Sequence, residues 1–181
     1  FAALTAAQLK ALSTAQLVVI DTVDVAALTT AQIAALSSSA VAALTDTSTG
    51  QVAALTSAQA AALSSAAVSG LSTAQIARLS SAQLNALSAT QLNAMSSAQL
   101  RAIETADVAA LTTAQVVKFD TSAISELSTA QIVAMGSAQF AALTAAQLKA
   151  LSTAQLVVID TVDVAALTTA QIAALSSSAV A

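Results

Sequence analysis

The chain has 181 residues, of which 8% are charged and 2% are aromatic, and it contains no Cys, His, Pro, Trp or Tyr. Its net charge of −4 argues against a nucleic-acid partner, which needs a basic face to neutralise phosphates. Without Cys or His there is no disulfide framework, no thiolate metal site and almost no material for acid–base or nucleophilic catalysis. We therefore expect no enzyme activity, no catalytic residues, no cofactor and no metal site.

The mean hydropathy of +0.82 raises the question of a membrane protein. However, Ser, Thr or Gln interrupts every eight residues, and no run of 18 apolar residues exists. We therefore expect no transmembrane segment. We read the lysines, Lys10, Lys118 and Lys149, as solvated charges at exposed positions.

A tandem repeat of eight residues runs from one end of the chain to the other. An apolar residue returns every eight residues from Leu4 to Leu175, with a single step of eleven residues between Leu44 and Leu55. The consensus is L-[ST]-[ST]-A-Q-[LIV]-x-A, and residues 71–78 form one clear unit. The eight positions of this octad are numbered from one, at the leucine, to eight.

A longer repeat is superimposed on the octads. Residues 1–42 recur unchanged as residues 140–181, an offset of 139 residues, which equals 17 octads plus three inserted residues. No linker or second domain interrupts the pattern. The sequence predicts one continuous octapeptide-repeat array over residues 1–181, an excerpt of a longer chain.

The octad spacing does not fit one long helix, because each unit would rotate the apolar positions by about 80° and no apolar stripe would form. A strand would place the leucine of position one on the same face as the glutamine of position five. Ala and Gln also favour strands poorly, so a β-solenoid is only the alternative fold.

The octad instead contains a complete helix-start signal. Position two is Ser, Thr or Asp at every site except Glu104 and Gly136, and position five is mostly Gln. This S/T-x-x-Q spacing is a capping box, and the apolar residues at positions one and six form a hydrophobic staple around it. A start signal every eight residues predicts helices of about six residues, one per octad.

Such short helices are marginal alone, so they must stack and share a core. We therefore predict an all-α solenoid of very short helices. We expect the alanines at positions four and eight to let neighbouring backbones approach closely. The capping box accounts for the Gln column more simply than an amide ladder between units does.

The insertion predicts a loop at residues 45–50, in which Gly50 can adopt a positive φ. It is either a tolerated surface bulge or a feature that sets a larger pitch or a lateral contact.

Pairs of carboxylates occupy positions two and five of three octads. They are Asp21 with Asp24, Glu104 with Asp107, and Asp160 with Asp163. We interpret them as N-cap and N3 residues, because negative charge is favoured at a helix N-terminus. A cation site built from carboxylate oxygens is the alternative.

Two further positions are variable. Position three carries a regular array of Ser and Thr hydroxyls, which suits an ice-facing or O-glycosylated surface. Position seven varies most, and Ala or Val there predicts a face that is often covered or forms a lateral assembly surface. Position seven is occupied by Lys10, Val18, Asn85, Asn93, Arg101, Val117 and Val133, among others.

Residues 111–117, Leu-Thr-Thr-Ala-Gln-Val-Val, resemble the first-helix segment of the DNA-binding repeats of TAL effectors. The second helix, the base-reading loop and the basic charge of those repeats are missing. The resemblance implies a short helix and not DNA binding.

The whole chain resembles the Ala/Thr/Ser/Gln-rich tandem arrays of giant bacterial secreted and surface proteins, such as adhesin stalks, surface layers, sheaths and filaments. This resemblance implies an extracellular or cell-surface structural protein that self-assembles with copies of the same chain. The alternative is a binding module whose repeat surface recognises ice, a glycan or a partner at the cell surface.

Overall fold

The computed structural model describes residues 3–175, which are entirely helical and irregular structure with no strand. The predicted all-α solenoid of short helices is confirmed, and the β-solenoid alternative is wrong. Each helix has four to seven residues, as in α2 and α21, and each belongs to one octad.

The helices fall into two compact units, residues 1–103 and 104–181, each described here by itself. In the first unit the helices are α1 (Ala6–Lys10), α2 (Thr14–Leu17), α3 (Thr22–Ala27), α4 (Thr30–Ala34), α5 (Ser38–Ala42), α6 (Gln51–Ala54), α7 (Ser57–Ala62), α8 (Ser65–Gly70), α9 (Thr73–Ile76), α10 (Ser81–Ala86), α11 (Ala89–Leu92) and α12 (Ser97–Ala102). In the second unit they are α13 (Thr105–Ala110), α14 (Thr113–Val116), α15 (Thr121–Ser125), α16 (Thr129–Ala134), α17 (Ser137–Ala142), α18 (Ala145–Ala150), α19 (Thr153–Leu156), α20 (Thr161–Ala165) and α21 (Thr169–Leu175).

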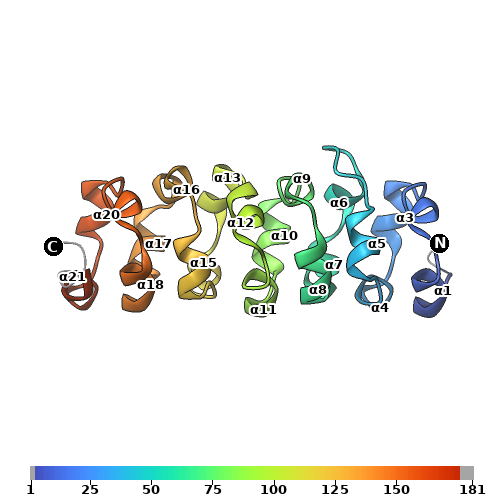
Figure 1. The fold of residues 1–181 in the computed structure, drawn as a ribbon, viewed down its shortest axis with the longest axis horizontal. Helices are drawn as coiled ribbons and strands as arrows, with labels where there is room; N and C mark the ends of the chain where they lie inside the picture. The colour runs from blue at the N-terminus through green and yellow to red at the C-terminus, as the bar shows by residue number, and fades with distance from the viewer. Residues whose placement is uncertain (1–2, 176–181) are drawn as a thin grey trace. The chain divides into compact units, whose positions relative to one another are not determined.

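Within each unit, a helix packs on the helix three positions further along the chain. The first unit contains the pairs α1–α4, α4–α7 and α7–α10, and the second contains α13–α16 and α16–α19. Figure 1 shows α3, α6 and α9 along one edge of the first unit, and α15, α18 and α21 along one edge of the second. One superhelical turn therefore takes three octads, and the helices form three columns.

The corner between two helices is made by two extended residues. In the octad that begins at Leu87, this leucine has φ −65° and ψ 142°, and the N-cap Ser88 has φ −76° and ψ 164°. The Leu87 N–H still donates to the Leu84 carbonyl (3.1 Å), which ends the preceding helix. No residue of the described chain has a positive φ, so these corners do not need the glycine that commonly follows a helix.

The core consists of the apolar residues at positions one and six. Ile76 and Leu84 at position six are 0% exposed, and Leu79 and Leu87 at position one are 2% and 1% exposed. These are the staple residues of the capping motif. The contact that fixes each helix start therefore also supplies the side chains that the next turn covers.

Residues 45–50 form an irregular segment that leaves the cap intact. The Thr45 hydroxyl accepts the Gln51 N–H (2.8 Å), and the Gln51 Oε1 accepts the Thr45 N–H (3.1 Å). Gly50 does not use the positive φ that glycine allows, because its backbone is extended with φ −81° and ψ −179°. Glycine is needed there because a Cβ would lie 2.8 Å from the Thr45 carbonyl oxygen.

The expectation that alanine at position four allows close backbone approach is also wrong. Ala82 and Ala98, at position four, are exposed on the outside of the array, whereas Ala86 and Ala102, at position eight, are half-buried. No helix within residues 3–175 is long and apolar enough to cross a membrane.

Candidate functional surface and the glutamine clamps

The glutamine at position five connects one turn to the next. In α10 the Gln83 Oε1 accepts the Ser80 N–H (2.7 Å), as the capping box requires, while the Gln83 N–H donates to the Ser80 hydroxyl (3.3 Å). The Gln83 Nε2 donates to the carbonyls of Val52 (3.1 Å) and Leu55 (2.6 Å), 31 and 28 residues earlier. Its amide therefore joins a corner to the corner one turn below.

This arrangement, called the glutamine clamp, recurs with similar geometry in both units. In the turn below, Nε2 donates to the carbonyl of position six of one octad and to that of position one of the next octad, where the helix has run out of its own amide donors. The clamps described within a single unit that use both carbonyls are those of Gln51, Gln59, Gln75, Gln83, Gln91, Gln99, Gln139, Gln147, Gln155 and Gln171.

The interpretation of the Gln column as a capping box alone was therefore incomplete. The box is present, as in α7 and α11, but it uses only Oε1 and the backbone N–H. The other half of the amide satisfies carbonyls that would otherwise be buried without a donor. This explains why these polar side chains are only 1–5% exposed where a turn lies below them.

The identical segments 1–42 and 140–181 show the effect of the turn below directly. Gln16 is exposed and bonds only within its own capping box with Ser13. Its copy, Gln155, has the same box and also donates to the carbonyl of Leu127 (2.7 Å), and it is 3% exposed. The clamp therefore depends on a neighbouring turn and not on the local sequence.

The carboxylate pairs act largely as the caps that we predicted. Asp21 accepts the Asp24 N–H, and Asp160 accepts the Asp163 N–H, both at 2.8 Å. Glu104 departs from this prediction, because its longer side chain makes no capping hydrogen bond at the start of α13.

Asp163 occupies the place of a clamping glutamine in α20. It is 8% exposed and accepts a short hydrogen bond from the Ser137 hydroxyl (2.6 Å) of α17, the helix below. A carboxylate has no N–H to donate to the corner carbonyls, so a hydroxyl donor from the turn below takes over the contact. Among the described residues there is no cluster of three or more acidic, His or Cys side chains able to hold a metal ion.

The Asp120 carboxylate caps α15. Its carboxylate accepts the Ala123 N–H (2.7 Å) and the Ser122 hydroxyl (2.7 Å). These two hydrogen bonds stabilise the charged form and lower the pKa of Asp120.

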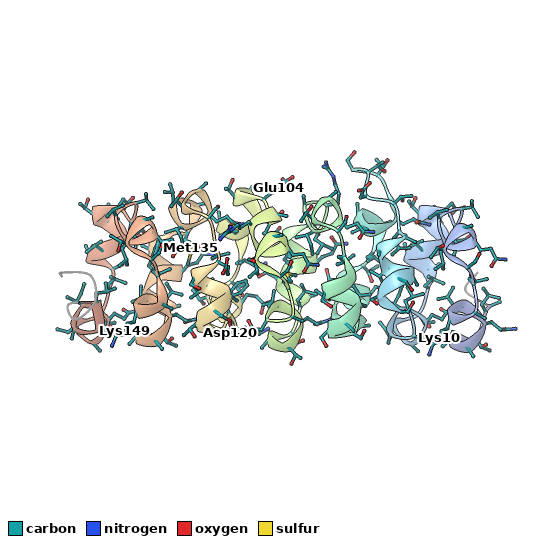
Figure 2. The ribbon with its side chains drawn as sticks, in the orientation of Figure 1. Lys10, Glu104, Asp120, Met135 and Lys149 are labelled. Carbon is teal, nitrogen blue, oxygen red and sulfur yellow. The ribbon has the colours of Figure 1, made fainter. Side chains whose placement is uncertain are left out.

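The outside of the array is formed by positions three, four and seven. Lys10 and Lys149, at position seven, are exposed, and Figure 2 places both at the outer edge of their units; Lys118, at position eight, is half-buried. The idea that position seven is often covered is wrong within each unit, because Val117 and Val133 are 43% and 61% exposed. The other large apolar residues that are exposed are Val18, Val19, Val23, Val157, Val162, Val164 and Ile172.

In the described part of the chain, the polar side chains of the glutamine clamps converge between turns, where they hold the stack together. The fold and the clamps define an all-α tandem-repeat protein. The ALTTAQ repeat model matches residues 17–47, 61–89, 68–102, 89–121, 100–136, 118–145, 132–161 and 145–177. These matches tile most of the chain, which therefore belongs to the ALTTAQ repeat family. No curated protein and no solved structure matches the chain.

Proposed function

We propose that the chain is a structural protein that builds an extracellular filament, sheath or surface fibre by stacking octapeptide repeats, with no enzymatic activity. The observation that supports this proposal is the uniformity of the clamps. The same amide-to-carbonyl contact recurs in both units, 31 residues apart across the insertion, as for Gln59 on Leu28, and 28 residues apart elsewhere, as for Gln171 on Leu143. A rod of stacked repeats is stabilised by such recurring contacts between neighbouring turns.

The outer surface supports the same proposal. Ala and Val side chains at positions four and seven, such as Ala130 and Val133 of α16, are exposed in an array with few charges. Such a surface favours lateral association between copies of the chain. The absence of Cys from the sequence also suits an exported protein that must avoid stray oxidation.

Electron microscopy of native assemblies tests this proposal. We expect ordered fibres at the cell surface or in the medium, with an axial periodicity set by the 139-residue repeat. An antibody against residues 45–50 should label them on intact cells. Dispersed monomers, or labelling only after the cells are opened, would contradict a structural extracellular role.

A binding module is the second candidate, favoured by the exposed hydroxyls of position three. Thr105, Thr129 and Thr153 are exposed at equivalent places on the stacked helices α13, α16 and α19, and the N-caps of α16 and α19 use the hydroxyls of position two instead. A dispersed chain that binds a glycan array or inhibits ice recrystallisation would favour this function over fibre formation.

A further inference from the structure

Two helices that pack on each other in the first unit, α5 and α8, lack the clamp. Position five is Ala40 in α5 and Ala67 in α8, and these helices lie in one column, α2–α5–α8. Alanine has no amide, so neither corner donates from this position to the turn below. The capping box is reduced to one hydrogen bond, in which Ser37 or Ser64 accepts the N–H of the alanine.

Close packing replaces the clamp along this column. A Cβ on Gly70 at the end of α8 would lie 2.7 Å from the Ser38 Cβ and 2.9 Å from the Ser38 carbonyl oxygen of α5. Ala67 is 0% exposed and Ala40 is 8% exposed. The two helices therefore touch through small residues and backbone. This contact, from Ala40 to Gly70, is called the alanine seam.

Each turn of the first unit contains three helices, so the second turn is α4–α6, the third is α7–α9 and the fourth is α10–α12. The other two columns carry clamps beside the seam. Between the second and third turns, Gln59 donates to Val25 and Leu28, and Gln75 donates to Val41 and Leu44. Between these two turns, two corners are thus held by clamps, and the third is held by packing.

The next level of the first unit differs. Between the third and fourth turns all three corners carry clamps, those of Gln83, Gln91 and Gln99. The column that contains the seam also has a clamp at this level, because the Gln91 Nε2 of α11 donates to the carbonyl of Leu63 (2.6 Å).

We propose that the alanine seam is the opening side of a hinge built into the array. The two clamped corners form the hinge axis, because parting them breaks several hydrogen bonds at once. Parting the seam breaks none of the clamps and separates only packed side chains and backbone of α5 and α8, so the turns tilt about that axis. The fully clamped level above the seam stays rigid. This inference stands independently of the proposed function.

Pairs of spin labels test the hinge directly, since the chain has no native cysteine. Ser39→Cys with Ala66→Cys spans the seam, and both residues are exposed at position four of α5 and α8. The matched control is Ala31→Cys with Ala58→Cys, at the same position of the clamped helices α4 and α7. Both pairs are 27 residues apart. We expect the seam pair to have a distance distribution about twice as broad as that of the control pair. Equal widths, or a narrower distribution across the seam, would overturn the hinge.

Hydrogen exchange of two clamp variants provides a second test that does not use labels. Gln59→Ala leaves one clamp at the level that contains the seam, whereas Gln91→Ala leaves two clamps at the fully clamped level. We expect Gln59→Ala to accelerate amide exchange in α7–α9 about fivefold or more, and Gln91→Ala to change α10–α12 by less than about twofold. Circular dichroism should be measured to check that both variants remain folded. Equal acceleration by the two variants would contradict a weak side at the seam.

Discussion

Removing one clamp in the interior of the first unit should cost more stability than removing a capping box alone. Gln83→Ala deletes an acceptor for the Ser80 N–H and a donor to the carbonyls of Val52 and Leu55. The site is 2% exposed, so water does not replace these partners freely. At a net value of about 1 kcal/mol for each hydrogen bond, the three losses lower the free energy of unfolding by about 3 kcal/mol.

Gln16→Ala is the matched control, because Gln16 has the same box with Ser13 but is exposed and makes no clamp. It should cost about 1 kcal/mol, so the difference of about 2 kcal/mol measures the clamp itself. Urea denaturation of both variants, followed by far-UV circular dichroism, gives the two values. Equal costs for Gln83→Ala and Gln16→Ala would show that Nε2 contributes nothing, and the reasoning would be wrong.

Gln83→Glu separates the two halves of the same amide. The carboxylate can still accept the Ser80 N–H, but it has no donor for the carbonyls of Val52 and Leu55. Burial should raise the pKa of the introduced carboxyl, because the charged form loses hydration and faces carbonyl oxygens. The folded state then binds the proton more tightly than the unfolded state, so this variant should gain stability relative to wild type as the pH falls from 7 towards 4. A relative loss of stability over that range would contradict the assigned orientation of the amide.

Three further predictions concern the other special positions of the chain. Gly70→Ala should destabilise the first unit by about 1–3 kcal/mol in urea denaturation, because the new Cβ meets the Ser38 backbone. Gly136→Ser should instead stabilise by a few tenths of a kcal/mol, on the order of an N-cap gain, since nothing lies within 4 Å of its Cβ position and the hydroxyl can cap α17; destabilisation would contradict it. The carboxyl of Asp120 should titrate below its ordinary value of 3.8 in an NMR pH series, because the Ala123 N–H favours its charged form. That contribution to stability is complete above the ordinary pKa, is lost as the pH falls through the lower folded value, and should vanish in Asp120→Asn.

The chemistry of glutamine explains why it recurs at position five. The site needs an acceptor for the N-cap N–H and, on the same planar group, a donor aimed at the carbonyls below. Among the natural side chains, Gln supplies both at the correct reach, whereas Asp163 supplies only acceptors and requires the hydroxyl of Ser137. Ala67 supplies neither, and there the turns pack closely through Gly70.

The sequence by itself determined the local features of this structure, which are the helix starts, the core residues and the helix length. The Ser–Gln spacing gives the helix starts, because a capping box joins residues three apart and needs no other part of the chain. The staple residues give the core, and the eight-residue interval limits the helix length. Leu87 and Ser88 also make an extended corner without any glycine, as the pattern of the sequence allows.

Only the tertiary structure decided how the helices stack. The number of helices in each turn, three, depends on the extended backbone angles at the corners. It could not be predicted from the side-chain pattern. The partners of a clamping glutamine lie 28 to 34 residues earlier in the chain, so Gln16 and Gln155, with identical flanking sequences, differ in burial. Capping is a property of consecutive residues, whereas clamping and burial are properties of the turn above and the turn below.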